Sequence, residues 1–226
     1  EGTHHAMTHI IVPIKDLSQA KQRLAGVLTK EHCEGLVLAM LEDLLITLST
    51  LPSCTVWVLA SNTKVFQVAQ RCGVRIINEH KSQGYNQAVA FGFKNFTGEP
   101  VAVIPGDVPL ASAVEILQLI KPTHNRKDLV RLAPDREKRG TNGLFLSQAH
   151  LMESGFGVRS YDGYLRTAKA KGIGVEKVFS TGLALDIDTP ADLEQLVRQA
   201  QEGETIKFLK QLGRHFGPQF LNQGAA

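Results

Sequence analysis

Three aspartates stand at two points of the 226-residue chain where an apolar run ends. Asp107 follows the apolar run that ends in Ile104-Pro-Gly, and Asp186 and Asp188 lie in the segment LDIDT. Ligands of an open α/β sheet bind outside the carboxyl ends of its strands, so Asp107 stands where chemistry can occur. A turn aspartate that caps the next helix would give the same pattern, and this position alone leaves both interpretations open.

Asp186 and Asp188 are two residues apart, and in an extended segment such residues point to the same face. Two carboxylates on one face repel each other unless a cation lies between them. Mg²⁺ prefers a few carboxylate oxygens together with substrate phosphates and water. With Asp107, the pair therefore predicts a magnesium site, although Asp188 alone could simply begin the last helix.

A basic segment follows the first apolar run of the chain. Lys15 comes directly after the run, and Lys21 and Arg23 follow within KQRL. Three cations near a strand end could neutralise a triphosphate, although a solvated helix face carries similar charge. Neither G-x-x-x-x-G-K-[ST] nor G-x-G-x-x-G follows this run, which argues against a P-loop NTPase and a dinucleotide-binding Rossmann enzyme.

Further polar motifs could bind a base or an anion. Gly84 and Asn86 begin a predicted helix, where Asn86 could read a base edge or cap the helix, and Gly106 would let the backbone approach a ligand. The loop APDREKRGTNG suits an oxyanion, and FGVRS leads into a helix whose N-terminus favours phosphate. Both loops also contain ordinary turn residues. The candidates in these two loops are Arg136, Thr141, Asn142, Gly157 and Ser160.

The elements that must position these residues alternate along the chain. Short apolar runs predict strands at residues 9–13, 55–60, 74–78, 100–104, 128–133, 143–146 and 173–179. Helical periodicity predicts helices at residues 31–50, 63–72, 82–95, 112–120, 161–171 and 190–201, with Thr189 as N-cap of the last and Pro190 as its first residue. Strands that alternate with helices predict an α/β domain with a mostly parallel sheet.

Composition narrows the class of protein. Hydrophobic residues are 43% and charged residues 21%, as in an ordinary globular domain, and a net charge of +3 without a basic stripe argues against a nucleic-acid partner. No run suits a membrane span, and three unpaired cysteines suit a reduced cytoplasmic protein. We expect residues 1–6 to be a tag remnant, residues 7–203 to be one domain, and residues 204–226 to be a docking helix with a frayed end.

Six motifs occur in a fixed order along the chain. They are P-x-K…K-x-R-L, G-x-N-x-A, PGD-x-P-L, APDR…GTN, FG-x-x-S and LD-x-DTP. This order resembles the 2-phospho-L-lactate guanylyltransferase family, which acts in the biosynthesis of coenzyme F-420, over roughly residues 10–197. The resemblance implies one nucleotidyltransferase domain over residues 7–203, built as a three-layer α/β/α sandwich with the nucleotide-diphospho-sugar transferase fold.

The resemblance also implies a reaction, in which GMP passes from GTP to a phosphorylated three-carbon acid and pyrophosphate is released. The acid would be 3-phospho-D-glycerate, phosphoenolpyruvate or 2-phospho-L-lactate, and the sequence does not choose among them. By position, Mg²⁺ would be bound by Asp107, Asp186 and Asp188, and GTP by Lys15, Lys21, Arg23, Gly84, Asn86 and Gly106. Lys15 and Lys21 would also act in catalysis, and the acid would contact Arg136, Thr141, Asn142, Gly157 and Ser160. This chain has Tyr85 and Val158 where the family often has a small residue and a proline.

Two other functions stay open. A cytidylyl- or molybdopterin-type nucleotidyltransferase would share the fold, but molybdopterin enzymes carry a Gly-rich first loop, and here no glycine follows the first strand before Gly26. A non-catalytic nucleotide-binding module would keep the basic segment without needing three acidic ligands. We expect a cytoplasmic enzyme whose partners are GTP and a small phosphorylated acid, with neither nucleic acid nor membrane, and we leave a homodimer open.

Overall fold

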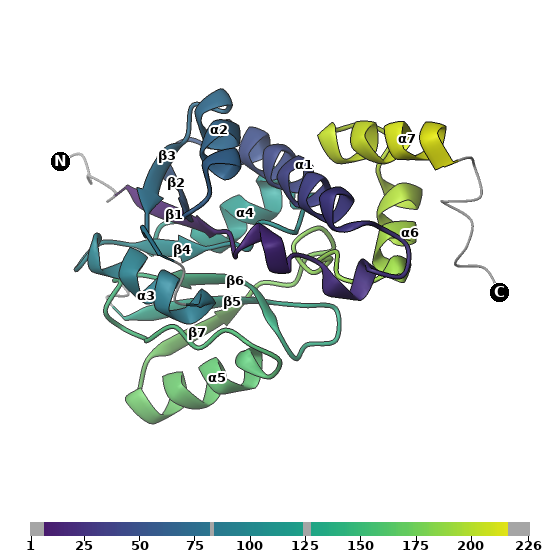
Figure 1. Ribbon diagram of the computed structural model, residues 1–226. Coiled ribbons are helices and arrows are strands. Elements are labelled where there is room, and N and C mark those ends of the chain that lie inside the picture. Colours follow the sequence, from purple (N-terminus) through teal and green to yellow (C-terminus); the bar gives the residue numbers. More distant parts are fainter. Residues whose placement is uncertain (1–6, 82–83, 124–127, 217–226) are drawn as a thin grey trace.

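The computed structural model describes residues 7–81, 84–123 and 128–216 (Figure 1). Its strands are β1 Thr8–Pro13, β2 Cys54–Ala60, β3 Arg75–Asn78, β4 Val101–Val103, β5 Leu129–Pro134, β6 Thr141–Leu146 and β7 Gly174–Lys177. They form one seven-stranded sheet in the order β3-β2-β1-β4-β6-β5-β7. β6 pairs antiparallel with β4 and β5, and every other pairing is parallel. The predicted mostly parallel sheet is confirmed.

Seven α-helices and two 3₁₀ helices lie within the described residues. They are η1 Leu17–Gln19, η2 Gln22–Leu24, α1 Lys30–Ser49, α2 Thr63–Arg71, α3 Tyr85–Lys94, α4 Ala113–Ile120, α5 Ser160–Lys171, α6 Pro190–Gln199 and α7 Glu204–Phe216. The six predicted helices are present, but residues 82–83 of the third lie outside the described residues, as do residues 1–6 and the expected frayed end at 222–226. Thr189 caps α6 and Pro190 is its first residue, as predicted.

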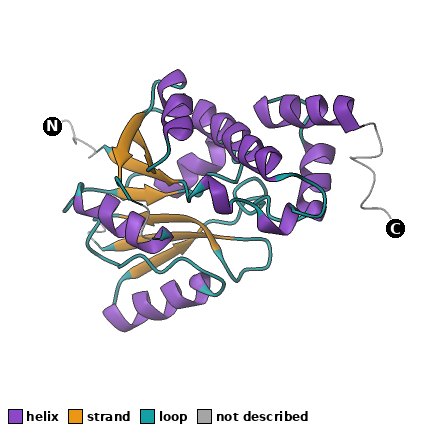
Figure 2. Ribbon diagram, viewed as in Figure 1, coloured by secondary structure: helices purple, strands orange, loops and turns teal. Residues whose placement is uncertain are grey.

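The sheet is covered by helices on both faces (Figure 2). Successive residues of a strand point to opposite faces, so Ile10 and Val12 of β1 pack with α1, α2, α4, α6 and α7. Ile11, between them, packs on the other face with α3 and α5. All three side chains are fully buried. The predicted three-layer α/β/α sandwich is confirmed.

The C-terminal helix α7 packs against α1 at one side of the molecule (Figure 1). The Phe208 ring lies so close to Gly35 that a Cβ there would be 2.6 Å from it. The Asp43 carboxylate on α1 accepts the backbone N–H groups of Glu204 and Thr205 at 2.7 and 2.8 Å. An anion at a helix N-terminus stabilises the helix, so Asp43 joins α7 to the main body. Among the described residues, no helix is both long and apolar enough to cross a membrane.

The direction of β6 decides which residues reach the functional edge of the sheet. The parallel strands β1, β4 and β5 all end at the same edge, and an antiparallel neighbour begins there. Thr141 of β6 pairs with Pro134 at the end of β5. Thr141 and Asn142 therefore lie at the carboxyl ends of the parallel strands, where ligands bind in α/β sheets.

Candidate active site

The two acidic segments are joined by a backbone hydrogen bond. The N–H of Ile187 donates to the carbonyl of Asp107 at 3.1 Å, so the LDIDT segment runs beside the loop after β4. Ile187 is fully buried, whereas Asp186 and Asp188 on either side of it stay partly exposed. The buried isoleucine anchors the segment, and the three aspartates lie together at one edge of the sheet.

Lys21 lies between two of the three aspartates. Its Nζ donates to Asp107 Oδ2 at 2.6 Å and to Asp188 Oδ1 at 2.7 Å, and its side chain is only 7% exposed. Its backbone has φ of 51°, in the left-handed region that costs a non-glycine residue energy. Burial alone would lower the pKa of Lys21, but the two carboxylates more than offset this and leave the pKa raised. Lys21 is therefore a charged residue held in a strained turn by two ion pairs.

All three cations of the basic segment act on Asp188. Burial raises the pKa of this carboxyl, but Lys21, then Arg23 and Lys15, lower it below its usual value. Lys15 Nζ also lies 5.3 Å from the centre of the Tyr85 ring, which is a cation–π distance. The structure thus brings the predicted basic segment and the predicted acidic pair to one place, as a phosphate site requires.

Asp186 has a different environment from Asp188. Burial raises its pKa, the Asn142 amide that donates to it at 3.0 Å lowers the pKa, and the neighbouring Asp107 and Asp188 raise it further. The result is a raised pKa, because no cation in the described part of the chain compensates this carboxylate as Lys21 compensates Asp188. Asp186 is therefore the member of the cluster with most to gain from an added cation.

A divalent cation fits the charge and the donor atoms of this cluster. Asp107, Asp186 and Asp188 carry three negative charges when ionised, and Lys21 offsets one of them. Mg²⁺ prefers hard oxygen ligands and commonly takes only one or two carboxylates, completing its shell with substrate phosphates and water. In the described parts of the chain, no three acidic, histidine or cysteine side chains converge as ligands on one point. The arrangement fits a cation shared with a phosphate better than a cage made by the protein alone.

A second polar cluster lies where β6 meets α5. The Ser160 hydroxyl donates to Thr141 Oγ1 at 3.0 Å, and both residues are buried. Ser160 is the first residue of α5, so the positive end of that helix dipole lies beside this pair. The Tyr161 N–H is already bonded to the Arg139 carbonyl at 3.0 Å. Gly157, with φ of 152°, lets the preceding loop turn, and its carbonyl accepts the Ser160 N–H at 3.0 Å. Hydroxyls beside a helix N-terminus are suited to binding a phosphate.

Asn86 does not cap α3, and its predicted contact with a base edge stays a prediction. Its Oδ1 accepts the Phe156 N–H at 2.8 Å and the Ser154 hydroxyl at 2.7 Å, and its Nδ2 donates to the Phe156 carbonyl at 2.8 Å. The N-cap position of α3 is taken by Gly84, whose φ of 107° suits glycine. Asn86 instead fixes the loop that leads to the Thr141–Ser160 pair.

Gly106 permits close packing between two loops of the site. A Cβ at this position would lie 2.2 Å from Ile14 Cδ1. The loops after β1 and β4 can meet there only because the side chain is absent. Gly106 therefore helps to position the neighbouring Asp107, and its contact with a nucleotide stays a prediction.

Arg136 is engaged by α6 and does not point freely toward an acid. Its guanidinium donates to the Asp192 carboxylate and to the Gln195 side-chain carbonyl. The same Asp192 carboxylate accepts the N–H groups of Asp188 and Thr189 at 3.1 and 2.8 Å. Arg136 therefore holds the loop before β6 against the segment that carries Asp188, and its contact with the acid stays a prediction.

Tyr85 is a site residue whose role the sequence did not predict. Its hydroxyl is buried without a hydrogen-bond partner among the described residues, and its ring packs edge-on against Phe156. Burial raises the pKa of Tyr85 well above its usual value, and Asp107 adds to the shift. Buried tyrosine hydroxyls usually find a partner, so this one keeps an unused donor and acceptor beside the cluster. The signal in the sequence was the tyrosine at a position where a small residue is usual.

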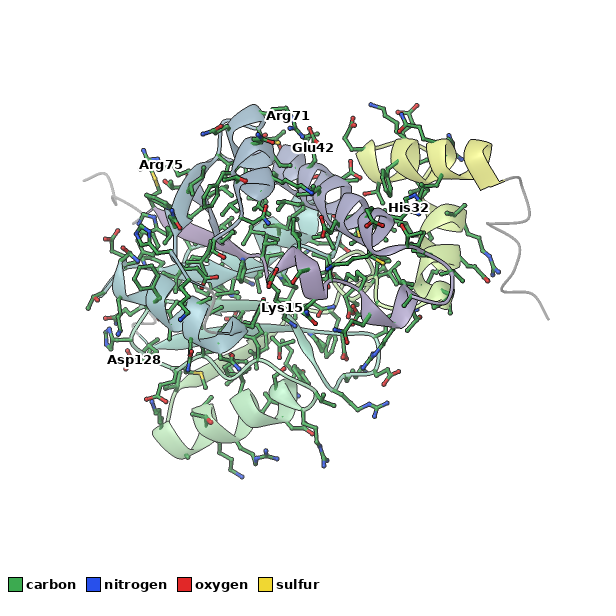
Figure 3. All side chains as sticks on the ribbon, in the orientation of Figure 1. Lys15, His32, Glu42, Arg71, Arg75 and Asp128 are labelled. Atoms are coloured by element: carbon green, nitrogen blue, oxygen red, sulfur yellow. The ribbon has the colours of Figure 1, made fainter. Side chains whose placement is uncertain are left out.

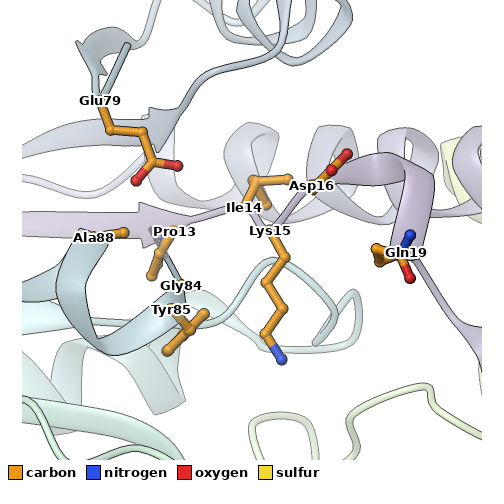
Figure 4. A pocket seen from close by; sticks show the side chains of 9 residues that line it. All are labelled: Pro13, Ile14, Lys15, Asp16, Gln19, Glu79, Gly84, Tyr85 and Ala88. Carbon is orange, nitrogen blue, oxygen red and sulfur yellow. The ribbon is translucent and has the colours of Figure 1, made fainter. Parts of the chain in front are cut away.

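A pocket of about 160 Å³ opens beside the basic segment (Figure 4). It lies between the end of β1, the segment after β3 and the start of α3. Its walls are Pro13, Ile14, Lys15, Asp16, Gln19, Glu79, Gly84, Tyr85 and Ala88. The predicted residues Lys15 and Gly84 line it, whereas Glu79 was not among the candidates.

The fold first places the chain in a broad structural class. A protein from Desulfovibrio desulfuricans G20, described as a candidate nucleotide-diphospho-sugar transferase, superimposes with a TM-score of 0.73 at 13% identity. The match covers 96% of this chain and 97% of that one. At this identity the likeness concerns the fold alone, and it agrees with the sheet and layers described above.

The sequence then gives the family. The family model described as "Guanylyl transferase CofC like" matches residues 8–223, so the chain belongs to this family and is a nucleotidyltransferase. A phosphoenolpyruvate guanylyltransferase from Sphaerobacter thermophilus is 32% identical over 204 residues, which are 87% of this chain and 95% of the relative. A 2-phospho-L-lactate guanylyltransferase from Methanocaldococcus vulcanius is 27% identical over 216 residues, which are 95% of each chain. The resemblance drawn from the six ordered motifs is confirmed.

Proposed function

We propose that this chain transfers GMP from GTP to the phosphate of a small phosphorylated three-carbon acid, releasing pyrophosphate, in coenzyme F-420 biosynthesis. The observation that carries the proposal is Lys21, which bonds to both Asp107 and Asp188 and so joins the basic segment to the acidic cluster. The Thr141–Ser160 pair supplies a second anion site next to that cluster, since Asn142 beside it bonds to Asp186. A transfer between two phosphates needs two such sites.

The nucleotide end of the site is basic. Lys15, Lys21 and Arg23 all act on Asp188, so they also lie close enough to attract a triphosphate bound beside it. Asp107, Asp186 and Asp188 are the residues that would hold Mg²⁺. When bound, this cation polarises phosphate oxygens and offsets charge on the departing pyrophosphate.

The acceptor end of the site is built from neutral donors. Thr141, Ser160 and the positive N-terminal end of α5 would hold the phosphate of the acid, and the buried Tyr85 hydroxyl would donate to it or to the carboxylate. A phosphate oxygen of the acid then attacks the α-phosphorus of GTP, and the bond from that phosphorus to the bridging oxygen breaks. No enzyme nucleophile is required, because two phosphates fixed in line react by positioning and charge stabilisation.

The acceptor acid stays a choice among three. The relatives above are named for phosphoenolpyruvate and for 2-phospho-L-lactate, and 3-phospho-D-glycerate carries the same two charged groups. We further propose a cytoplasmic location, which is supported by three free cysteines at Cys33, Cys54 and Cys72. A homodimer stays a prediction that a single chain does not test.

Pyrophosphate release tests the proposal directly. The full chain is incubated with Mg²⁺, GTP and each of the three acids, and the product is identified by its mass. We expect release with at least one acid, and a loss of about 100-fold or more in Asp107→Asn and Asp188→Asn. Asp128→Asn is the control, because Figure 3 shows Asp128 at an edge of the molecule far from Lys15.

Two results would contradict the proposal. Tight binding of GTP without pyrophosphate release from any acid would favour a non-catalytic nucleotide-binding module. A clear preference for CTP would favour a cytidylyltransferase of the same fold.

A further inference from the structure

The pocket beside the basic segment is placed to receive the base of a nucleotide. Lys15 is both a wall of the pocket and part of the basic segment, so phosphates on that segment would leave the rest of the nucleotide next to the pocket. The volume of about 160 Å³ is well below the roughly 300–1,000 Å³ of pockets for drug-sized ligands. It suits a flat ring system better than a whole nucleotide. Pro13, Ile14 and Ala88 give it apolar walls against which such a ring can pack.

Most polar side chains around the pocket are already engaged. Asp16 accepts the Ser18 N–H at 2.9 Å, and the Gln19 carbonyl accepts the Gln22 amide at 2.7 Å. Glu79 follows β3 directly, and its carboxylate has no hydrogen bond or ion pair within the described parts of the chain. Figure 4 shows this carboxylate directed toward the Pro13 side of the pocket. Partial burial raises the pKa of Glu79, as expected for an acid without a cation beside it.

The charge of Glu79 limits what the pocket can bind. A carboxylate accepts hydrogen bonds and donates none, so it repels the phosphates and carboxylates of the proposed substrates. Its ligand must instead present N–H donors. Two adjacent donors satisfy both carboxylate oxygens at once, which gives a charge-assisted bidentate pair.

Guanine is the common base that presents such a pair. Its N1–H and its 2-amino group point in the same direction, whereas adenine and cytosine each present one amino group there and uracil one N–H. We infer that the pocket binds the guanine ring and that the Glu79 carboxylate selects it by accepting N1–H and the 2-amino group. This inference rests on the proposed function, because it names the residue that gives that activity its choice of base.

Replacing Glu79 with glutamine tests the inference, with GTP and ITP compared as substrates. ITP lacks the 2-amino group but keeps N1–H. We expect the wild-type chain to prefer GTP over ITP by about tenfold or more, because an unpaired polar group is costly. In Glu79→Gln we expect kcat/KM for GTP to fall about 10- to 100-fold and the preference for GTP over ITP to fall toward one. If Glu79 had a purely structural role, kcat/KM would fall equally for GTP and ITP, and the ratio of the two would not change.

Two further variants and a binding measurement make the result decisive. Glu202→Gln removes an exposed acid between α6 and α7 and should leave both the rate and the ratio as in wild type. Asp16→Asn changes the other acid of the pocket. A ratio that collapses in Asp16→Asn but not in Glu79→Gln overturns the inference. Dissociation constants for GTP and ITP are measured in parallel. If the wild-type chain is inactive with every acid, the proposed function is refuted, and the dissociation constants still test whether the pocket selects guanine.

Discussion

Replacing Lys21 with methionine should destabilise the fold strongly. Its ammonium is paired at 2.6 and 2.7 Å with Asp107 and Asp188, and its side chain is 7% exposed. Removing one partner of a fully buried ion pair costs about 3–5 kcal/mol. Here the carboxylates left behind are 27% and 42% exposed, so water compensates part of their charge and the expected cost is about 2–3 kcal/mol. Methionine is a flexible side chain that fills much of the same space, so the loss reflects charge more than packing. In a chain of this size the loss corresponds to a fall in Tm of about 4–12 °C.

Thermal unfolding at neutral pH, first without divalent cations and then with Mg²⁺, measures this effect. Because Lys21→Met leaves the acidic cluster uncompensated, Mg²⁺ should raise the Tm of the variant more than that of wild type. Lys64→Met is the matched control. Lys64 pairs with Glu34 at 3.0 Å, but its side chain is 60% exposed, so its loss should cost at most about 1 kcal/mol.

A Lys21→Met variant that melts at the same temperature as Lys64→Met would refute this reasoning. A double variant gives a second check. Lys21→Met with Asp188→Asn removes one of the carboxylates left unpaired, so the combined loss should be smaller than the sum of the two single losses. Strict additivity would show that the ammonium and the Asp188 carboxylate do not stabilise each other.

Other predictions concern Asp186, Gly182 and Tyr85. Asp186 has a pKa above its usual value of 3.8, so its charged form destabilises the folded state. This destabilisation is absent below pH 3.8 and grows as the pH rises to the folded pKa. Asp186→Asn should therefore be more stable than wild type in urea at pH 7, equally stable at pH 3, and inactive. Gly182→Ala should lower the free energy of unfolding in urea by about 1–3 kcal/mol, because a Cβ would lie 2.2 Å from the Leu110 carbonyl oxygen. The control Gly163→Ala has open space in helix α5 and should be neutral or slightly stabilising. Tyr85→Phe removes a hydroxyl that has no partner among the described residues, so the Tm should not fall, whereas KM for the acid should rise. A lower Tm with an unchanged KM would show that the hydroxyl serves the fold.

Most of the fold could be predicted from local patterns. The central strands β1, β2 and β4 are short apolar runs, and they pair in parallel once those runs lie side by side. The caps are also local: Thr189 and Pro190 mark the start of α6 through their own backbone and side-chain chemistry. The antiparallel direction of β6 could not be predicted in this way, because an apolar run carries no sign of its direction.

The contacts of the site were harder to predict, because they join residues far apart in the sequence. Lys21 reaches Asp188 across 167 positions, and no spacing rule indicates that an ammonium lies between two of the proposed metal ligands. Asn86 and Arg136 are polar, near glycines and near strand ends, as ligand-binding residues are. In the structure their side chains fix loops, because they bond to Phe156 and to Asp192. Residue type predicted where the polar groups gather but not which of them stay available.

Availability separates the residues that bind substrate from those that position them. A buried or half-buried polar group needs partners, and a group that the protein leaves unpaired costs stability unless a ligand completes it. In the described parts of the chain, the Tyr85 hydroxyl and the Glu79 carboxylate are left in this state, and Asp186 lacks a compensating cation. They lie around the acceptor phosphate, the base and the cation of the proposed reaction, respectively. If that reaction is correct, GTP, acid and Mg²⁺ together should raise the Tm more than the sum of their separate effects, because each completes a group that shares its surroundings with the others.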